Sequence, residues 1–192
     1  MLVAARHYHH LYDGCLLLAA SPRPVRLVVA LDWVEDAWRR RGLEALCAWA
    51  GWPGLLRSER LSETGGAYRP REALRYLRRS LEAAVGVLLA GEPLVVFPEG
   101  YPNVDPRPTP KLGDEMLPFR RGFAVIATVA SRRLGVPLPV LPAGLHYQGR
   151  CARLAFGAPI RVAGDADVRD LVGRVESEVR RLSAPAMRAP LP

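Results

Sequence analysis

Short apolar runs alternate with longer amphipathic stretches along this 192-residue chain, and this alternation restricts the fold more than any other feature. A short apolar run bounded by turn residues predicts a buried strand, whereas apolar residues that recur every three or four positions predict a helix face. Strands and helices that alternate along a chain are typical of an α/β domain. We therefore expect an α/β fold in which helices cover a sheet.

The expected elements follow this pattern along the chain. Strands are expected over the apolar runs Leu2–Ala5, Arg26–Leu31, Leu94–Phe97, Leu138–Pro142 and Leu154–Phe156. Helices are expected over the amphipathic stretches Tyr12–Ala20, Val34–Trp49, Pro70–Leu89, Gly122–Leu134 and Val168–Leu182. Two helices show the spacing most clearly, the second through Trp38, Ala45, Leu46 and Trp49 and the third through Leu74, Leu77, Leu81 and Leu88. We expect each of these faces to be buried against the sheet.

A single domain is expected over residues 1–183, followed by a flexible tail over 184–192. The 17 glycines and 18 prolines stay below the fraction of about a quarter that indicates disorder, so the chain should be globular. The stretch Asn103–Asp114 is rich in proline and turn-forming residues. It predicts a loop of a length that is usually functional.

Targeting signals and cysteine spacing bear on the compartment. The sequence contains no run of about 18 apolar residues, and its first residues lack the regions of a signal peptide. We therefore expect a cytoplasmic protein. The cysteines, Cys15, Cys47 and Cys151, lie far apart among apolar neighbours and are expected to be buried thiols.

Positive charge is the strongest compositional signal. The net charge is +8, and among the 27 lysines and arginines only Lys111 is a lysine. A GC-rich genome is one explanation of this bias, and the binding of phosphate, which arginine holds with two parallel hydrogen bonds, is another. A basic surface favours anionic partners. Nucleic acid is not the partner we expect, because the chain has no known nucleic-acid-binding motif and no basic patch interleaved with aromatic residues.

Three histidines follow the first expected strand. They are His7, His9 and His10, and Asp13 comes shortly after them. A histidine that a carboxylate holds in one tautomer can remove a proton from a hydroxyl near neutral pH. The cluster therefore predicts a general base, while a polar surface turn is the alternative.

A second segment, Phe97-Pro98-Glu99-Gly100, closes an expected strand. Proline ends the strand because it cannot donate to the sheet, and glycine permits a sharp turn. The carboxylate of Glu99 is left at the carboxyl end of a strand, where α/β sheets place their sites. This segment and the histidine–carboxylate pair, in this order along the chain, resemble the motifs of the glycerolipid acyltransferase family.

The resemblance implies both a fold and an activity. The fold would be a single α/β domain with a largely parallel central sheet flanked by helices. The activity would be the transfer of a fatty acyl group from an acyl thioester to a hydroxyl of a lysophospholipid or a glycerol phosphate. Acyl-CoA or an acyl-carrier protein would be the co-substrate, with no further cofactor and no metal.

The register of the histidine differs from the family pattern, which is a histidine, four residues and an aspartate. That spacing falls on Tyr8. His7 follows the strand as the family's histidine does, and a one-residue bulge would restore its contact with Asp13. His9 is the alternative, because residues four apart share a helix face. A zinc site formed by His7, His9 and Asp13 is a further interpretation.

The resemblance also implies an acceptor site. It assigns Glu99 and Gly100 to the acceptor, although Tyr101 and Pro102 replace the Thr-Arg that follows in the family. Gly51–Arg57 keeps the spacing of another family segment.

By that segment, Arg57 would bind the acceptor's phosphate. Arg120 and Arg121, at an expected step into a helix, are further candidates for holding an anion. Val136–Pro142 resembles the family strand that shapes the acyl pocket.

All four tryptophans fall between Trp33 and Trp52, with Trp38 and Trp49 in an expected helix that also contains Arg39–Arg41. This mixture suits a segment that rests on an anionic membrane surface, and burial in the core is the other explanation. The first interpretation implies peripheral attachment at the inner face of the membrane. The shifted histidine and the lost Thr-Arg leave a catalytically inactive, lipid-binding relative as the alternative function.

Overall fold

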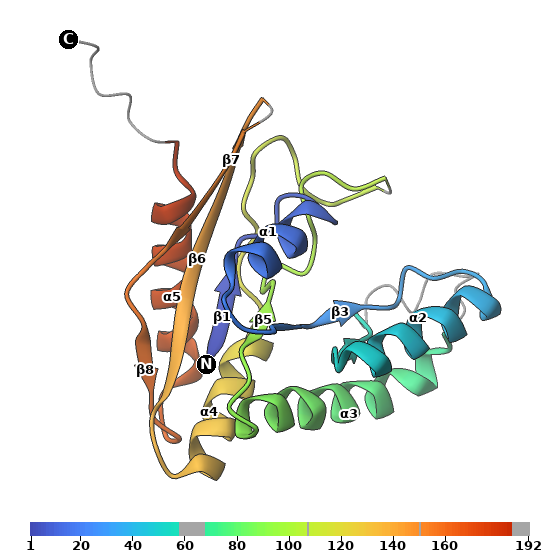
Figure 1. The fold of residues 1–192 in the computed structure, drawn as a ribbon, viewed down its shortest axis with the longest axis horizontal. Coiled ribbons are helices and arrows are strands. Elements are labelled where there is room, and N and C mark those ends of the chain that lie inside the picture. Colours follow the sequence, from blue (N-terminus) through green and yellow to red (C-terminus); the bar gives the residue numbers. More distant parts are fainter. Residues whose placement is uncertain (58–67, 107, 150, 186–192) are drawn as a thin grey trace.

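The computed structural model describes residues 1–57, 68–106, 108–149 and 151–185. A six-stranded sheet lies at the centre (Figure 1). Five of its strands lie in the spatial order β2 (Arg26–Leu27), β5 (Leu94–Val96), β1 (Leu2–Ala5), β6 (Leu138–Gln148) and β7 (Cys151–Phe156). The sixth, β8 (Ile160–Val162), also pairs with β6. The first four strands run parallel, and β7 and β8 pair with β6 in the antiparallel sense. The chain is therefore a single α/β fold with a mostly parallel central sheet flanked by helices. The sequence pattern predicted the α/β fold, and the resemblance implied the largely parallel sheet.

Strand β1 sits in the middle of the sheet and is buried throughout. Leu2 lies opposite Leu94 of β5 and Val140 of β6. Because side chains alternate along a strand, Leu2 and Ala4 belong to one core and Val3 and Ala5 to another. The two faces of the sheet therefore pack against different helices.

Three helices cover one face, which we call the closed face. They are α3 (Pro70–Leu89), α4 (Gly122–Leu134) and α5 (Val168–Ser183), and their buried side chains form one core with β1, β5 and β6. Phe123 of α4 is the largest fully buried side chain of this core. Helix α5 comes very close to β6, since a Cβ at Gly144 would lie 2.5 Å from the backbone of Leu182.

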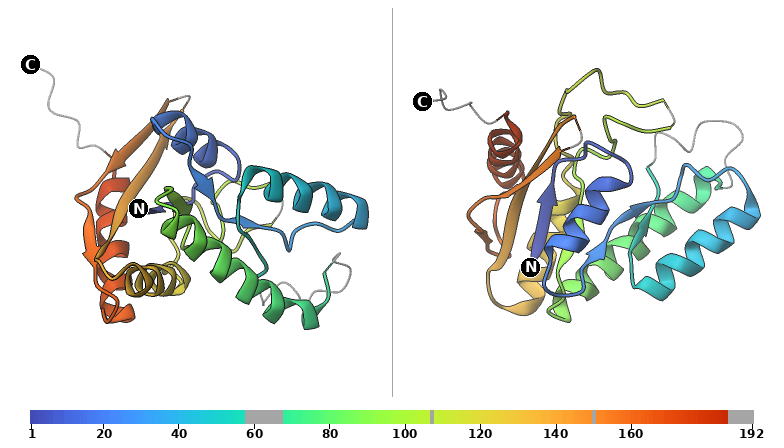
Figure 2. Two further views of the ribbon diagram at one scale, coloured as in Figure 1. Left: turned by 60° about the horizontal axis from the view of Figure 1, so that its bottom comes forward. Right: turned by 45° about the horizontal axis from the view of Figure 1, so that its top comes forward.

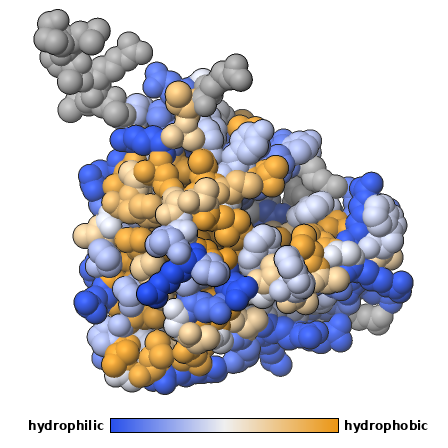
Figure 3. All heavy atoms as spheres, in the orientation of Figure 1, coloured by the Kyte–Doolittle hydropathy of each residue, from blue (hydrophilic) through white to orange (hydrophobic). Residues whose placement is uncertain are grey.

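The opposite face, which we call the open face, is covered by α1 (Tyr12–Ala20). Figure 2 shows α1 and α5 on opposite sides of the sheet. Leu17 of α1 packs on this face, but Leu141 and Leu154 are half-buried and Phe156 is 47% exposed. Hydrophobic side chains consequently gather at the surface over α1, β6 and β7 (Figure 3).

A small second sheet extends the molecule beyond the central one. It pairs β3 (Val29–Ala30) with β4 (Gly54–Leu55) in parallel, and α2 (Ala37–Ala50) connects the two strands. Helix α2 lies beside the N-terminal half of α3 (Figure 1), where Arg40 bonds to Glu72 at 3.0 Å. A separate cluster of buried side chains fills this part, formed by Leu31, Val34, Cys47, Leu56 and Tyr68.

Most expected elements are confirmed, and the differences have local causes. The helices expected over 12–20, 70–89 and 122–134 have these same bounds. The strand expected over 26–31 is broken at Val28, whose amide donates to the Val95 carbonyl, whereas the Val29 amide donates to the Pro53 carbonyl. The run therefore passes from one sheet to the other. Two short strands, β4 and β8, gave no recognisable apolar run and were missed.

Predictions about burial were less accurate. Trp38 and Trp49 of α2 are 71% and 83% exposed, because the opposite side of the helix, with Cys47, faces the small core. Leu46 of α2 and Leu74 and Leu77 of α3 are exposed as well. The expected α3 face is buried only in its second half, where Leu88 lies in the closed-face core and Leu81 packs against it.

Among the cysteines only Cys47 is buried, and the prediction was wrong for Cys15 and Cys151. Within the described parts of the chain, no helix has the length and apolar character needed to cross a membrane. Most of the expected tail, residues 186–192, lies outside the described residues.

Candidate active site

His7 and Asp13 meet where β1 passes into α1. The Nδ1 atom of His7 lies 3.0 Å from Oδ2 of Asp13, whose side chain is fully buried, while the His7 side chain remains 15% exposed. The extra residue relative to the family spacing is taken up before the helix, where the amides of Tyr8 and His9 both donate to Asp13 Oδ2 at 2.6 and 2.9 Å. The contact that the sequence proposed for His7 is therefore present in the structure.

Asp13 is held from a fourth direction by Tyr147. The Tyr147 hydroxyl, at the far end of β6, donates to Asp13 Oδ1 at 2.7 Å, and its ring stacks on Tyr8 with centroids 4.9 Å apart. Burial, followed by this hydrogen bond to the carboxylate, raises the pKa of the Tyr147 phenol, which keeps the hydroxyl a donor. Sequence reasoning missed Tyr147, because no local motif marks a residue 134 positions away from its partner.

The other two histidines have different roles. The Nδ1 atom of His9 accepts from the amides of Leu11 and Tyr12 at 3.3 and 3.4 Å, and its ring stacks on Tyr12. Burial, and then the neighbouring His10, lower the pKa of His9, which agrees with a neutral ring that accepts hydrogen bonds. His10 contacts the carbonyl of Val104 through Nδ1 at 3.3 Å. Neither ring contacts Asp13 through a hydrogen bond in the described structure.

Glu99 is buried against the backbone of His7. It is 1% exposed, and its Oε1 atom accepts from the His7 amide at 2.7 Å. The Oε2 atom accepts from the Leu117 amide at 3.0 Å and pairs with Lys111 Nζ at 2.5 Å. Both carboxylate oxygens are thus occupied within the protein, which differs from the acceptor contact that we predicted.

Arg57 is anchored on the small sheet by Asp32. Its Nε and Nη2 atoms bond to Asp32 Oδ2 at 2.9 and 2.8 Å, and its Nη1 atom donates to the Gly100 carbonyl at 2.5 Å. The guanidinium lies 4.3 Å from the centre of the Tyr101 ring. Arg57 therefore connects the end of the Gly51–Arg57 segment to the turn after β5. The carboxylate of Asp32 balances the charge of the Arg57 guanidinium.

Arg120 approaches the same turn from the start of α4. Its guanidinium lies 5.5 Å from the Tyr101 ring, so two arginines flank this one aromatic side chain. Gly100 has a positive φ of 78°, and a Cβ there would lie 2.9 Å from Arg120 Nε, so only glycine suits this position. Arg121 is the exposed N-cap residue of α4, and the structure does not bring it to Tyr101 among the described contacts.

A pocket of about 500 Å³ lies next to His7, between α1, β2–β3 and the loop that follows β5. The ring of His7 stacks on Phe97 at 4.3 Å between centroids, and both residues line the pocket. Much of the wall is apolar, from side chains that include Leu18, Leu27, Val29, Trp33 and Trp52. Arg57 and Tyr101 also reach it. The pocket therefore combines an apolar wall with an oriented imidazole and a guanidinium.

The arrangement is suited to proton removal beside an apolar ligand. With Asp13 at Nδ1, the Nε2 atom of His7 is left to take a proton, as in other carboxylate–histidine pairs. Across residues 1–57, 68–106, 108–149 and 151–185, no three His, Cys, Asp or Glu side chains lie close enough together to hold a metal ion. The imidazole of His9, turned to the start of α1, does not join His7 at Asp13 as the zinc interpretation required.

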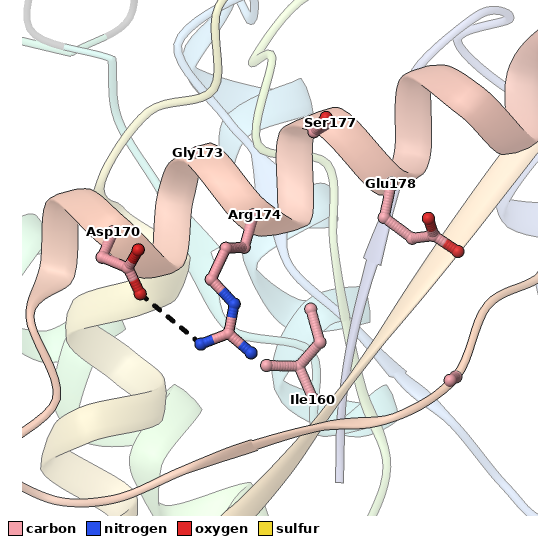
Figure 4. A pocket seen from close by; sticks show the side chains of 7 residues that line it. Ile160, Asp170, Gly173, Arg174, Ser177 and Glu178 are labelled. Carbon is pink, nitrogen blue, oxygen red and sulfur yellow. Dashed lines mark hydrogen bonds and ion pairs between the residues drawn. The ribbon is translucent and has the colours of Figure 1, made fainter.

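A second hollow, of about 690 Å³, runs along α5 (Figure 4). It is an open groove lined by Ile160, Gly173, Ser177 and charged side chains of the helix. Arg174 bonds to Asp170 at 3.4 Å, and Glu178 bonds to Arg181. Its charges are thus already paired along the helix, and the His7 pocket remains the better candidate.

Comparison of the chain with models of protein families, with curated proteins and with solved structures gives no match.

Proposed function

We propose that the chain is an O-acyltransferase of the glycerolipid type, in which His7 is the general base and Asp13 orients it. The observation that carries this proposal is the contact between His7 and Asp13 at the wall of an apolar pocket that also contains Arg57. An apolar wall suits a fatty acyl chain, and a guanidinium suits the phosphate of a glycerol-phosphate or lysophospholipid acceptor.

In the proposed reaction, His7 removes the first proton. Its Nε2 atom takes the proton of the acceptor hydroxyl, the oxygen attacks the thioester carbonyl, and an ester C–O bond forms as the C–S bond breaks. The proton then passes from the imidazolium to the leaving thiolate. Acyl-CoA or an acyl-carrier protein supplies the thioester, and no further cofactor takes part.

The acceptor phosphate is assigned to the arginines around Tyr101. Arg57 still has N–H groups beyond those bonded to Asp32 and Gly100, and Arg120 lies on the same ring. Arg121, next in sequence but not in contact with Tyr101 among the described contacts, supplies only a further positive charge at the start of α4. This grouping takes the place of the Thr-Arg that the resemblance would have required after Gly100.

The first experiment identifies the substrate. The protein is supplied with acyl-CoA and a lipid extract, and mass spectrometry detects which lysolipid gains an acyl group. His7→Ala should lower kcat by roughly 10²–10⁴, and Asp13→Asn by a comparable factor, because the imidazole loses its orientation. His9→Ala and His10→Ala are matched controls and should cost less than about tenfold. Full activity in His7→Ala and Asp13→Asn would refute the mechanism. Loss of activity in His9→Ala alone would identify His9 rather than His7 as the base.

The second experiment examines the acceptor. Its variant is Arg120→Gln, because Arg57→Ala would leave buried Asp32 without its partner. Arg120→Gln should raise the KM of the acceptor by about tenfold or more, with little change in the KM of the donor, because one charge-assisted hydrogen bond is removed. Equal effects on both substrates would exclude Arg120 from the acceptor site.

A lipid-binding protein without catalysis is the second candidate, and one observation favours it. Arg57 is already bonded to Asp32, which reduces its availability for a phosphate. Under this alternative, lysophospholipid binds with unchanged affinity to His7→Ala, and no acylated product forms with any thioester. Turnover by the wild-type protein would exclude this candidate.

We also propose peripheral attachment to an anionic membrane through α2. Trp38, Ala45 and Trp49 share the outward face of this helix, and helical geometry places the exposed Arg39 and Arg41 on its two flanks. Trp38→Ala/Trp49→Ala should abolish sedimentation with anionic vesicles, and Arg39→Gln/Arg41→Gln should weaken it by about 1 kcal/mol per charge.

The matched control for this surface lies on α3. Leu74→Ala/Leu77→Ala removes apolar side chains that are also exposed, but on the neighbouring helix, and should leave vesicle binding unchanged. Absence of binding by the wild-type protein at low salt would refute the attachment. It would leave the acyltransferase proposal intact for a dispersed substrate.

A further inference from the structure

A buried ion pair holds both backbone polar groups of His7. The His7 amide donates to Glu99 Oε1 at 2.7 Å, and the Nζ atom of Lys111 donates to the His7 carbonyl at 2.6 Å. Lys111 Nζ and Glu99 Oε2 are 2.5 Å apart, so the two side chains and the backbone amide and carbonyl of His7 form a closed ring of contacts. Both backbone groups of the proposed base are therefore fixed by side chains from distant parts of the chain.

The pair is completely enclosed. The side chains of Lys111 and Glu99 are 0% exposed, and Lys111 is the one lysine in the sequence. Burial lowers the pKa of Lys111, while its pairing with Glu99 acts in the opposite direction. A charge withdrawn from water this far persists only with close partners, and Lys111 has a third one in Asn103 Oδ1 at 3.0 Å.

The position of the pair connects it to the long loop after β5. Lys111 comes from that loop, and Asn103 fastens the loop to itself by donating to the carbonyls of Gly113 and Glu115 at 2.9 and 2.7 Å. Glu99 follows β5 and also accepts from the Leu117 amide. The loop expected to be functional is thus attached to the backbone of the proposed base.

We propose that the Lys111–Glu99 pair is a positioning device for His7, which sets the imidazole between Asp13 and Phe97. The His7 ring has one hydrogen-bonded neighbour and one stacked neighbour, so a small rotation of its backbone would disturb both contacts. The effect on catalysis rests on the proposed function. The effect on the geometry of the ring does not.

The test is Lys111→Met, which keeps the length of the side chain and removes the charge and the donor. Ring ¹⁵N chemical shifts of His7, assigned by comparison with His7→Ala, report its tautomer and its hydrogen bond to Asp13. We expect these shifts to change and kcat to fall by roughly tenfold to a hundredfold, with little change in KM, because the reacting nitrogen is displaced. Arg133→Met, which breaks the exposed pair with Glu82, is the matched control and should change neither.

A second variant keeps the test valid if Lys111→Met does not fold. Lys111→Met/Glu99→Gln removes both charges together and leaves no unpaired buried ion, so it should fold while the His7 carbonyl still lacks its donor. Wild-type ring shifts and wild-type kcat in whichever variant folds would overturn the proposal and leave the pair a purely stabilising one. If the variant changes the ring shifts but the wild-type protein itself shows no turnover, the result would support the positioning role and refute the acyltransferase function.

Discussion

The closed and open faces of the central sheet are built from alternate residues of the same strands, yet they differ in what covers them. Three helices seal the closed face, and Gly144 allows the last of them to approach within contact of β6. One nine-residue helix, α1, covers the open face, and the candidate pocket lies beside it. Parallel sheets usually have helices on both faces. The difference indicates that the closed face supplies stability, while incomplete cover on the other face leaves room for a ligand.

Removal of a phenylalanine from each face gives the largest expected contrast. Phe123→Ala on the closed face should lower the free energy of unfolding by about 3–5 kcal/mol, because it leaves a cavity in a fully buried core. Phe97→Ala on the open face should cost less, because Phe97 is only partly buried and lines the pocket. Urea unfolding measures both, and equal losses would contradict the division between the faces.

The order of the two variants should reverse for activity, with the larger loss in Phe97→Ala. The folded fraction of Phe123→Ala should keep its kcat, whereas Phe97→Ala should reduce kcat because the His7 ring loses the aromatic side chain on which it stacks. Product formation per folded molecule is the measurement. A loss of kcat in Phe123→Ala at temperatures where it is folded would show that the closed face also influences the site.

Two glycines provide a smaller version of this comparison. Gly144→Ala should destabilise the protein by about 1–3 kcal/mol, because the new methyl group meets the backbone of Leu182, which cannot move without shifting α5. Gly14→Ala, on α1, places its methyl 3.4 Å from Leu27 Cδ1, an ordinary contact, and should change stability by less than about 1 kcal/mol. Thermal unfolding of the two variants tests this. A similar loss in both would mean that the open face is as tightly packed as the closed one.

The smallest expected effect is a pH dependence at the start of α1. The folded protein lowers the pKa of His9 below its ordinary value of 6.5, so the unfolded chain binds the proton more readily. The free energy of unfolding should therefore fall as the pH falls through 6.5 toward the pKa of the folded state. Denaturation at several pH values, with His9→Gln as the comparison, measures this, and an identical slope in the variant would exclude His9 as its source.

Much of the fold could be predicted from the sequence because its helices and central strands carry strong periodic signals. The face of α2 with Trp38 and Trp49 could not, because periodicity identifies an apolar face without showing whether anything covers it. At the site, the motif located His7 and Asp13, since both lie in one short segment. Tyr147 and Lys111 had no such signal, because their partners are brought to them only by the sheet and the long loop.

The partners of His7 and Asp13 have a consequence for the order in which the molecule is made. His7 is synthesised before Glu99 and Lys111, which follow it by 92 and 104 positions, and Tyr147 follows Asp13 by 134. Contacts between residues so far apart require long loops to close and therefore form late. A nascent chain consequently carries the proposed base without the groups that hold it until these later residues have been made. During refolding, recovery of activity should lag behind recovery of helical structure.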